Sequence, residues 1–95
     1  MKYDFTTVSG VRLIAAVLGD GCLDKRFRLF YANSAPELVQ GFLEDAKNIF
    51  KEDLTYNLYK KRTDSVQVVE LSARHGRAVA ETGIRPGRKV ENNQG

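Results

Sequence analysis

The sequence contains a single cysteine, Cys22, and no apolar run long enough for a membrane helix. One thiol cannot form an internal disulfide, and it cannot supply the cysteine pairs of a structural zinc site. A membrane-spanning helix needs about 20 consecutive apolar residues, and the first residues also lack the apolar segment of a signal peptide. We therefore expect a protein of the reducing cytoplasm with no membrane partner.

The local patterns of several enzyme classes are also missing. No serine or cysteine stands in a recognisable nucleophile setting, and Gly19-Asp20-Gly21 is not a phosphate-binding loop. His75 is the only histidine, and a histidine at the start of a helix is more often a surface or capping residue than a catalyst. No sequence repeat and no low-complexity segment is present. Any function must therefore come from other residue types.

The chain has 95 residues, of which 42% are hydrophobic and 28% charged, which suits one folded domain. Its 15 basic residues exceed 12 acidic ones only mildly, but the two kinds are unevenly distributed. The basic clusters lie at 25–28, 60–62, 74–77 and 85–89, and acids gather at Glu37, Glu44, Asp45, Glu52 and Asp53. Such segregation can leave one face basic, as phosphate binding needs. Ordinary solvated surface charge is the alternative interpretation.

The segment Val11–Leu18 is apolar on nearly all sides and predicts a short helix. Ser9 is the expected N-cap, and Gly19-Asp20-Gly21 should end the helix through a left-handed cap, which gives about ten residues. A helix without a polar face must be buried on several sides. Its small residues Ala15, Ala16 and Gly19 suit close contact with another helix.

Two pairs of strands are predicted, each joined by a short turn. The first pair covers 22–26 and 27–33 around a turn at Asp24-Lys25, with Phe27, Leu29 and Tyr31 on one face. The second covers 54–62 and 66–72, joined by the polar turn 63–65. If Leu58 points to the core, then Asn57, Tyr59 and Lys61 share the opposite face, and Arg28 lies opposite Leu29 by the same test.

A second helix should separate these pairs, and a third should follow them. Ser34 is the expected N-cap of the second helix, with Pro36 in the first turn and Glu37 at the capping-box position. Its apolar face is expected to contain Leu38, Phe42, Ala46, Ile49 and Phe50. The last helix is expected over Arg74–Thr82, capped by Gly83, before a polar tail that is disordered at 91–95.

This order predicts an α+β domain over residues 1–90, with a four-stranded antiparallel sheet and the helices on one face. The other face would be open and receive about half of the strand side chains. A curved two-stranded ribbon fits the major groove of DNA, so such a face is a credible reading surface.

The run from Leu13 to Gly21, Leu-Ile-Ala-Ala-Val-Leu-Gly-Asp-Gly, is followed by Cys22-Leu23. It resembles the LAGLIDADG motif of homing endonucleases, in the form common among archaeal and intein-encoded members. Three further segments resemble the family at their expected places: Arg28–Ser34, Leu58–Lys61 and Gly83–Lys89. The resemblance covers roughly residues 8–90, which is one αββαββα half-unit.

The resemblance implies a homodimer that pairs through the first helix and binds double-stranded DNA of approximate two-fold symmetry. The dimer interface would contain Leu13, Ala15, Ala16 and Gly19. Asp20 would be the catalytic residue, and with the Gly19 carbonyl it would hold Mg²⁺ or another divalent cation. The alternative for Asp20 is a turn residue favoured after a helix end. The expected DNA contacts come from Arg26, Arg28, Asn33, Asn57, Tyr59 and Lys61.

One departure concerns the metal centre. Active members of the family usually carry a basic residue near the metal, often at the end of the second strand. This chain has Asn33-Ser34-Ala35 there, so Lys60, Lys61 or Arg74 would have to replace it. The leading hypothesis is a metal-dependent, site-specific DNA endonuclease encoded in an intron or intein. The alternatives are a non-cleaving relative, such as a repressor-like protein or an RNA maturase, and a purely structural α+β dimer.

Overall fold

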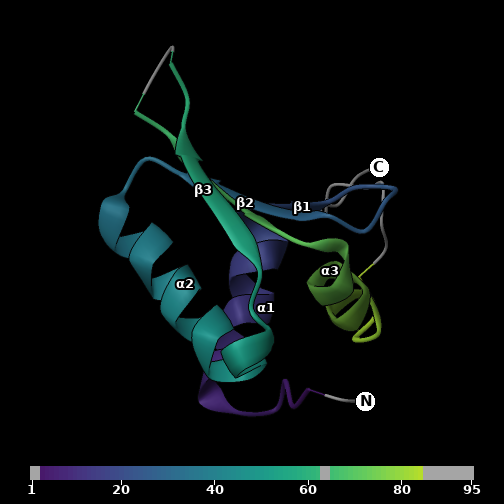
Figure 1. The fold of residues 1–95 in the computed structure, drawn as a ribbon. Coiled ribbons are helices and arrows are strands. Elements are labelled where there is room, and N and C mark those ends of the chain that lie inside the picture. Colours follow the sequence, from purple (N-terminus) through teal and green to yellow (C-terminus); the bar gives the residue numbers. More distant parts are fainter. Residues whose placement is uncertain (1–2, 63–64, 85–95) are drawn as a thin grey trace, which may run out of the picture.

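Helices and pairs of strands alternate along the chain in the computed structural model, which describes residues 3–62 and 65–84 (Figure 1). In chain order the elements are α1 (Val8–Asp20), β1 (Gly21–Leu23), β2 (Leu29–Asn33), α2 (Pro36–Phe50), the 3₁₀ helix η1 (Lys51–Asp53), β3 (Tyr56–Lys60), β4 (Gln67–Leu71) and α3 (Ala73–Ala80). This confirms the predicted order of elements. The predicted tail at 91–95 lies outside the described residues.

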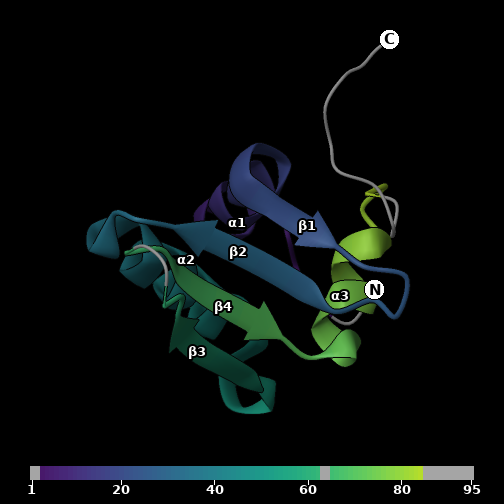
Figure 2. The same cartoon turned by 90° about the horizontal axis from the view of Figure 1, so that it is seen from above.

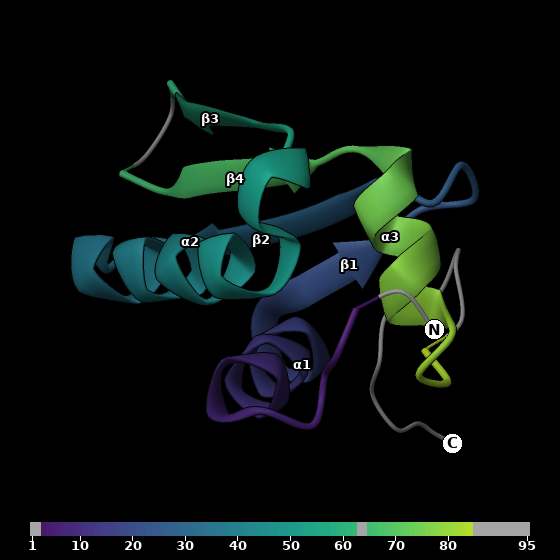
Figure 3. The same ribbon diagram turned by 60° about the horizontal axis from the view of Figure 1, so that its bottom comes forward.

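The four strands form one antiparallel sheet in the order β1-β2-β4-β3. All three helices lie on the same side of this sheet (Figures 1 and 3), and the view from above shows the strands uncovered by them (Figure 2). The fold is therefore α+β with a four-stranded antiparallel sheet, as predicted. One sheet face is covered and the other is open.

Strand side chains alternate between these two faces. Leu29 and Tyr31 of β2 pair in register with Leu71 and Val69 of β4, and all four are buried in the core against the helices. The Tyr31 ring stacks on Phe42 of α2, with ring centroids 4.5 Å apart. The core is thus fixed by the alternation that the sequence predicted for these two strands.

Helix α1 is longer than predicted, with 13 residues. Its N-cap is Thr7, not Ser9, because the Thr7 hydroxyl accepts a hydrogen bond from the Gly10 N–H at 3.1 Å. At the other end Gly21 is extended, with φ −97°, so the predicted left-handed cap is wrong. The helix instead passes directly into β1, which places Asp20 at the junction of helix and sheet.

Helix α2 also departs from its prediction at the N-terminus. Its N-cap is Ala35, which makes no side-chain capping bond, so the Ser34 cap and its capping box are wrong. Asn33 supplies the local bond instead, because its Oδ1 accepts from the Ala35 N–H at 2.9 Å. Leu38 lies outside the core with 51% of its surface exposed, and Val39 is buried in its place.

The predicted two-residue hairpin turn between β1 and β2 is a longer connection, and Phe27 belongs to it rather than to a strand. The Asp24 carboxylate accepts the backbone N–H groups of Arg26 and Arg28, both at 2.8 Å. Phe27 has a positive φ of 68°, and its carbonyl lies so close to Gly76 of α3 that a Cβ at Gly76 would clash. Any side chain at position 76 would therefore push α3 away from this turn.

Candidate functional site

The outer side of α1, turned away from the core, is apolar and exposed. Val8, Val11 and Leu18 have 69%, 57% and 43% of their surface accessible, and Ala15 between them is also exposed. These four residues, the outer stripe, are spaced by three, four and three positions, the pattern of a helix–helix contact. The expectation that α1 is buried on several sides is wrong for the single chain, where only its inner side is covered.

The structure separates the four residues predicted for the dimer interface. Ala15 and Gly19 are exposed on α1, and no atom lies within 4 Å of a Cβ built on Gly19. Ala16 is half-buried and packs against the core, and Leu13 is completely buried in it. Val8, Val11 and Leu18, which the sequence reasoning did not select, are the exposed apolar residues that accompany Ala15.

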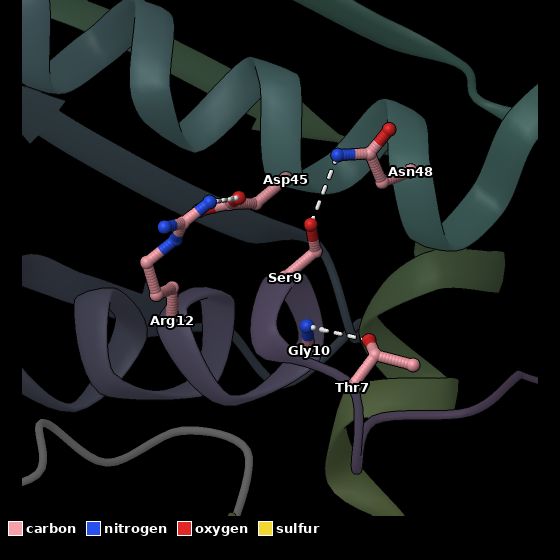
Figure 4. A network of polar contacts seen from close by, with 6 residues as sticks. All are labelled: Thr7, Ser9, Gly10, Arg12, Asp45 and Asn48. Atoms are coloured by element: carbon pink, nitrogen blue, oxygen red, sulfur yellow. Dashed lines mark hydrogen bonds and ion pairs between the residues drawn. The ribbon is translucent and has the colours of Figure 1, made fainter.

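Polar contacts with α2 fix which side of α1 faces outward (Figure 4). Arg12 forms an ion pair with Asp45 at 3.1 Å, and Asn48 donates to the Ser9 hydroxyl at 2.9 Å. Asp45 is buried although the sequence suggested a surface acid, and Arg12 is its partner. Because leaving a buried carboxylate unpaired is unfavourable, these contacts resist a rotation of α1 that would hide the outer stripe.

A groove of about 700 Å³ lies between α1 and α2 beside the outer stripe. Ala15 and Ala16 line it from α1, and Leu38, Gly41 and Phe42 line it from α2. The exposed Leu38 therefore lies on the α1 side of α2. The apolar surface of the outer stripe continues into this groove.

Asp20 is exposed at the C-terminal end of α1. The Asn33 amide, at the end of β2, donates a hydrogen bond from Nδ2 to Asp20 Oδ2 at 3.1 Å. The predicted DNA contact Asn33 and the predicted metal ligand Asp20 are thus neighbours, which sequence reasoning did not foresee. Burial raises the pKa of Tyr31, and the negative charge of Asp20 raises it further, so Tyr31 stays neutral beside the carboxylate.

The groups at this helix end have the right chemistry for a hard divalent cation, but one chain supplies few of them. The Asp20 carboxylate and the Gly19 carbonyl are oxygen donors, and carbonyls in a last helical turn have no donor further along the helix. Among residues 3–62 and 65–84, no group of three or more histidine, cysteine, aspartate or glutamate side chains is placed to hold a metal ion. A site built on Asp20 therefore needs a second carboxylate from elsewhere.

The candidate basic residues differ in their position relative to Asp20. Lys60 pairs with Gln67, which pairs with Asn33, so all three lie in one cross-strand row. Two strand spacings place the backbone of Lys60 about 10 Å from that of Asn33. Arg74 lies in α3, at the opposite end of the sheet. Lys60 is thus the better placed of these two.

The open face contains the predicted DNA contacts Asn57 and Tyr59, which pair in register with Glu70 and Val68. Both are exposed and lie on the face opposite Leu58, as predicted, but Leu58 itself keeps 42% of its surface exposed, so its expected place in the core is wrong. The centre of this face is not basic, because Glu70 is the only charged side chain among its paired residues. Its side chains are Cys22, Phe30, Ala32, Asn57, Tyr59, Val68 and Glu70.

Basic residues lie at the two ends of the sheet instead. The β1–β2 turn contains Lys25, Arg26 and Arg28 at one end, and Lys60, Lys61 and Arg62 lie in and after β3 at the other. These two groups, the basic ends, are all exposed. Arg28 forms an ion pair with Glu70 at 3.1 Å. The helical side carries the exposed acids Glu37 and Glu44 on α2.

His75 is neither a surface nor a capping residue, contrary to expectation. It is completely buried, and its Nε2 accepts a hydrogen bond from the Thr55 N–H at 2.9 Å, while its ring lies 4.1 Å from that of Phe50. Burial lowers the pKa of His75, and the positive charge of Arg74 lowers it further. The neutral imidazole therefore joins α3 to the end of α2 and the start of β3.

Comparison of the chain with known protein families, curated proteins and solved structures gives no match. In the described part of the chain, no helix has both the length and the apolar character needed to cross a membrane.

Proposed function

We propose that the chain binds double-stranded DNA as a homodimer of LAGLIDADG-like half-units and cleaves it with a divalent metal. The observation that carries this proposal is the outer stripe of α1, which ends at the exposed carboxylate of Asp20. An apolar contact surface leading to a metal-binding residue is what such a half-unit requires. The αββαββα order over the described residues agrees with it.

Pairing through the outer stripe supplies what the single chain lacks. Complete burial of a valine or leucine side chain contributes about 1.5–3 kcal/mol, and both copies contribute in a two-fold interface. If the two α1 helices run parallel, like residues face each other and the small Ala15 allows close approach. The same arrangement brings the two Asp20 side chains together at one end of the interface.

At that end the two Asp20 carboxylates and the two Gly19 carbonyls would hold the metal. Mg²⁺ bound there supplies a means to orient a nucleophilic water and to stabilise charge on the leaving oxygen. Asn33 donates to Oδ2 of Asp20, which would help to orient the carboxylate toward the metal. Asn33 is thus a positioning residue for Asp20.

The open face is the DNA-binding surface in this proposal. Asn57 and Tyr59 would meet base edges in the major groove, and the residues of the basic ends other than Arg28 would contact phosphates on either side. The exposed acids Glu37 and Glu44 lie on the helical side, where they do not repel the phosphates.

Two measurements test the proposal on the full chain. A salt series of duplex binding should give a steep negative slope of log affinity against log salt, and Lys61→Ala should reduce it by about one unit. Incubation of a duplex library with Mg²⁺ should give strand cleavage that Asp20→Asn abolishes while binding persists. Glu44→Gln, on the helical side, is the matched control and should change neither result. Equal cleavage by Asp20→Asn and the unsubstituted chain would refute the catalytic role of Asp20.

One observation favours a second candidate, a DNA-binding protein that does not cleave. The side-chain partner of Asp20 is the neutral amide of Asn33, and no lysine or arginine contact to Asp20 is found in the described part of the chain. Specific binding without cleavage at any tested Mg²⁺ concentration would select this function. A flat salt dependence would leave only the structural dimer.

A further inference from the structure

The Arg28–Glu70 pair lies on the open face and was not assigned a joint role by the sequence. Arg28 Nη1 lies 3.1 Å from Glu70 Oε2, and the two side chains are 44% and 18% exposed. Glu70 is in register with Phe30 and Asn57, which places its side chain on the open face. An arginine fixed at its guanidinium in this way differs from the lysines of the basic ends, which form no ion pair with another described residue.

The backbone beneath Arg28 is also held. Its N–H donates to the Asp24 carboxylate at 2.8 Å, and its carbonyl accepts from the Asp24 N–H at 3.0 Å. Both the start and the end of this side chain are therefore tied to other residues. Because fewer rotamers remain to be lost on binding, a held arginine is suited to directional hydrogen bonding.

A hollow of about 280 Å³ borders the pair, lined by Arg28, Asn57 and Glu70 together with Thr55 and Ser72. The guanidinium is thus partly accessible from the open face while one of its nitrogens is bound to Glu70. A guanidinium has five N–H donors, so the remaining ones can still form the bidentate contact that a guanine edge accepts.

We infer that Glu70 positions Arg28 as a guanine-reading residue, and that this pair does not serve as a phosphate contact. The inference rests on the proposed DNA binding by the open face. The charges of the pair cancel, so its attraction for phosphate is weak, whereas no ion pair of Lys61 is found in the described part of the chain. Sequence preference and salt dependence then belong to different residues of the same surface.

The test is a random duplex library enriched on the full chain, followed by a salt series on the enriched duplex. Arg28→Ala should reduce the preference for guanine at one base pair of each half-site by roughly five- to 150-fold, and leave the salt slope unchanged. Glu70→Gln, of nearly the same shape, should relax the same base pair. It should also make the slope steeper, because the released guanidinium can reach a phosphate.

Two further variants separate positioning from a merely structural role. Glu70→Asp keeps the charge and should restore part of the preference, and Lys61→Ala should change the slope without changing the preference. A reduced slope in Arg28→Ala, or full preference in Glu70→Gln, would overturn the inference while leaving DNA binding intact. Failure of the unsubstituted chain to enrich any duplex would instead remove the proposed function, and this inference with it.

Discussion

Helices α1 and α2 pack on the same face of the sheet, yet their outer sides are opposite in character. The outer side of α2 is polar at Gln40 and Lys47, as water requires. The outer side of α1 is the apolar outer stripe. Both helices bury their inner sides in the same core, so the core does not explain the difference between their outer sides. The proposed second copy, which would cover α1 but not α2, would account for it.

The largest expected effect comes from a charge placed on the outer stripe. Val11→Glu should weaken self-association by about 3 kcal/mol or more, roughly a hundredfold or more in the dissociation constant, because two unpaired carboxylates would be buried at the two-fold axis. Gln40→Glu places the same group on the outer side of α2 and should leave association unchanged. Sedimentation velocity at several concentrations measures both, and an unsubstituted chain that stays monomeric at high micromolar concentration would contradict the pairing.

A medium effect should distinguish two adjacent alanines. Ala16 packs against the core, so Ala16→Leu should overfill it and lower the free energy of unfolding by roughly 1–3 kcal/mol. Ala15 is exposed, so Ala15→Leu should leave the unfolding of the monomer within about 0.5 kcal/mol and change only the association. Both variants should be unfolded with urea in the Val11→Glu background, because that substitution is expected to keep the chain monomeric. The assignment of the two faces is wrong if Ala15→Leu is the more destabilising change there.

The smallest effect is the pH dependence of stability that His75 causes where it contacts Phe50, at the end of α2. The unfolded chain binds a proton at His75 below a pH of about 6.5, but the lowered pKa keeps the folded imidazole neutral. Stability should therefore be complete above about pH 6.5 and fall as the pH decreases toward the folded pKa, by at most about 1.4 kcal/mol per pH unit.

His75→Gln is the control for this dependence, because its amide oxygen can accept the Thr55 N–H but does not titrate. Urea unfolding between pH 4 and 8 should show a flatter pH profile for this variant. An unchanged profile would mean that other groups cause the acid sensitivity.

The sequence predicted the order of elements and the shared face of Asn57 and Tyr59, because both follow from local periodicity. It did not predict the buried state of His75, since this depends on Thr55 and Phe50 from other elements. The Arg12–Asp45 pair joins residues 33 positions apart, and no local pattern reveals it.

The sequence likewise predicted some residues of the candidate site and missed others. Motif resemblance selected Asp20 and the first helix, but helical spacing alone could not show which side of α1 faces the core. Residues 8, 11, 15 and 18 and residues 10, 13 and 17 are both plausible contact stripes. The sheet and the contacts with α2 decide between them. Asn33 and Glu70 were likewise found only when cross-strand neighbours were known.

Strand β3 lies at one edge of the sheet, where no other described strand pairs with it, and all its residues from Tyr56 to Lys60 are exposed. A free edge with exposed tyrosine and leucine side chains is a template for aggregation into larger sheets. Lysines on a strand edge oppose such aggregation, because two positively charged edges repel each other. Lys60 ends β3 and Lys61 follows it. The positive charge at this end therefore opposes edge-to-edge aggregation, so the proposed pairing of two copies through the uncharged outer stripe of α1 would not compete with an open-ended polymer.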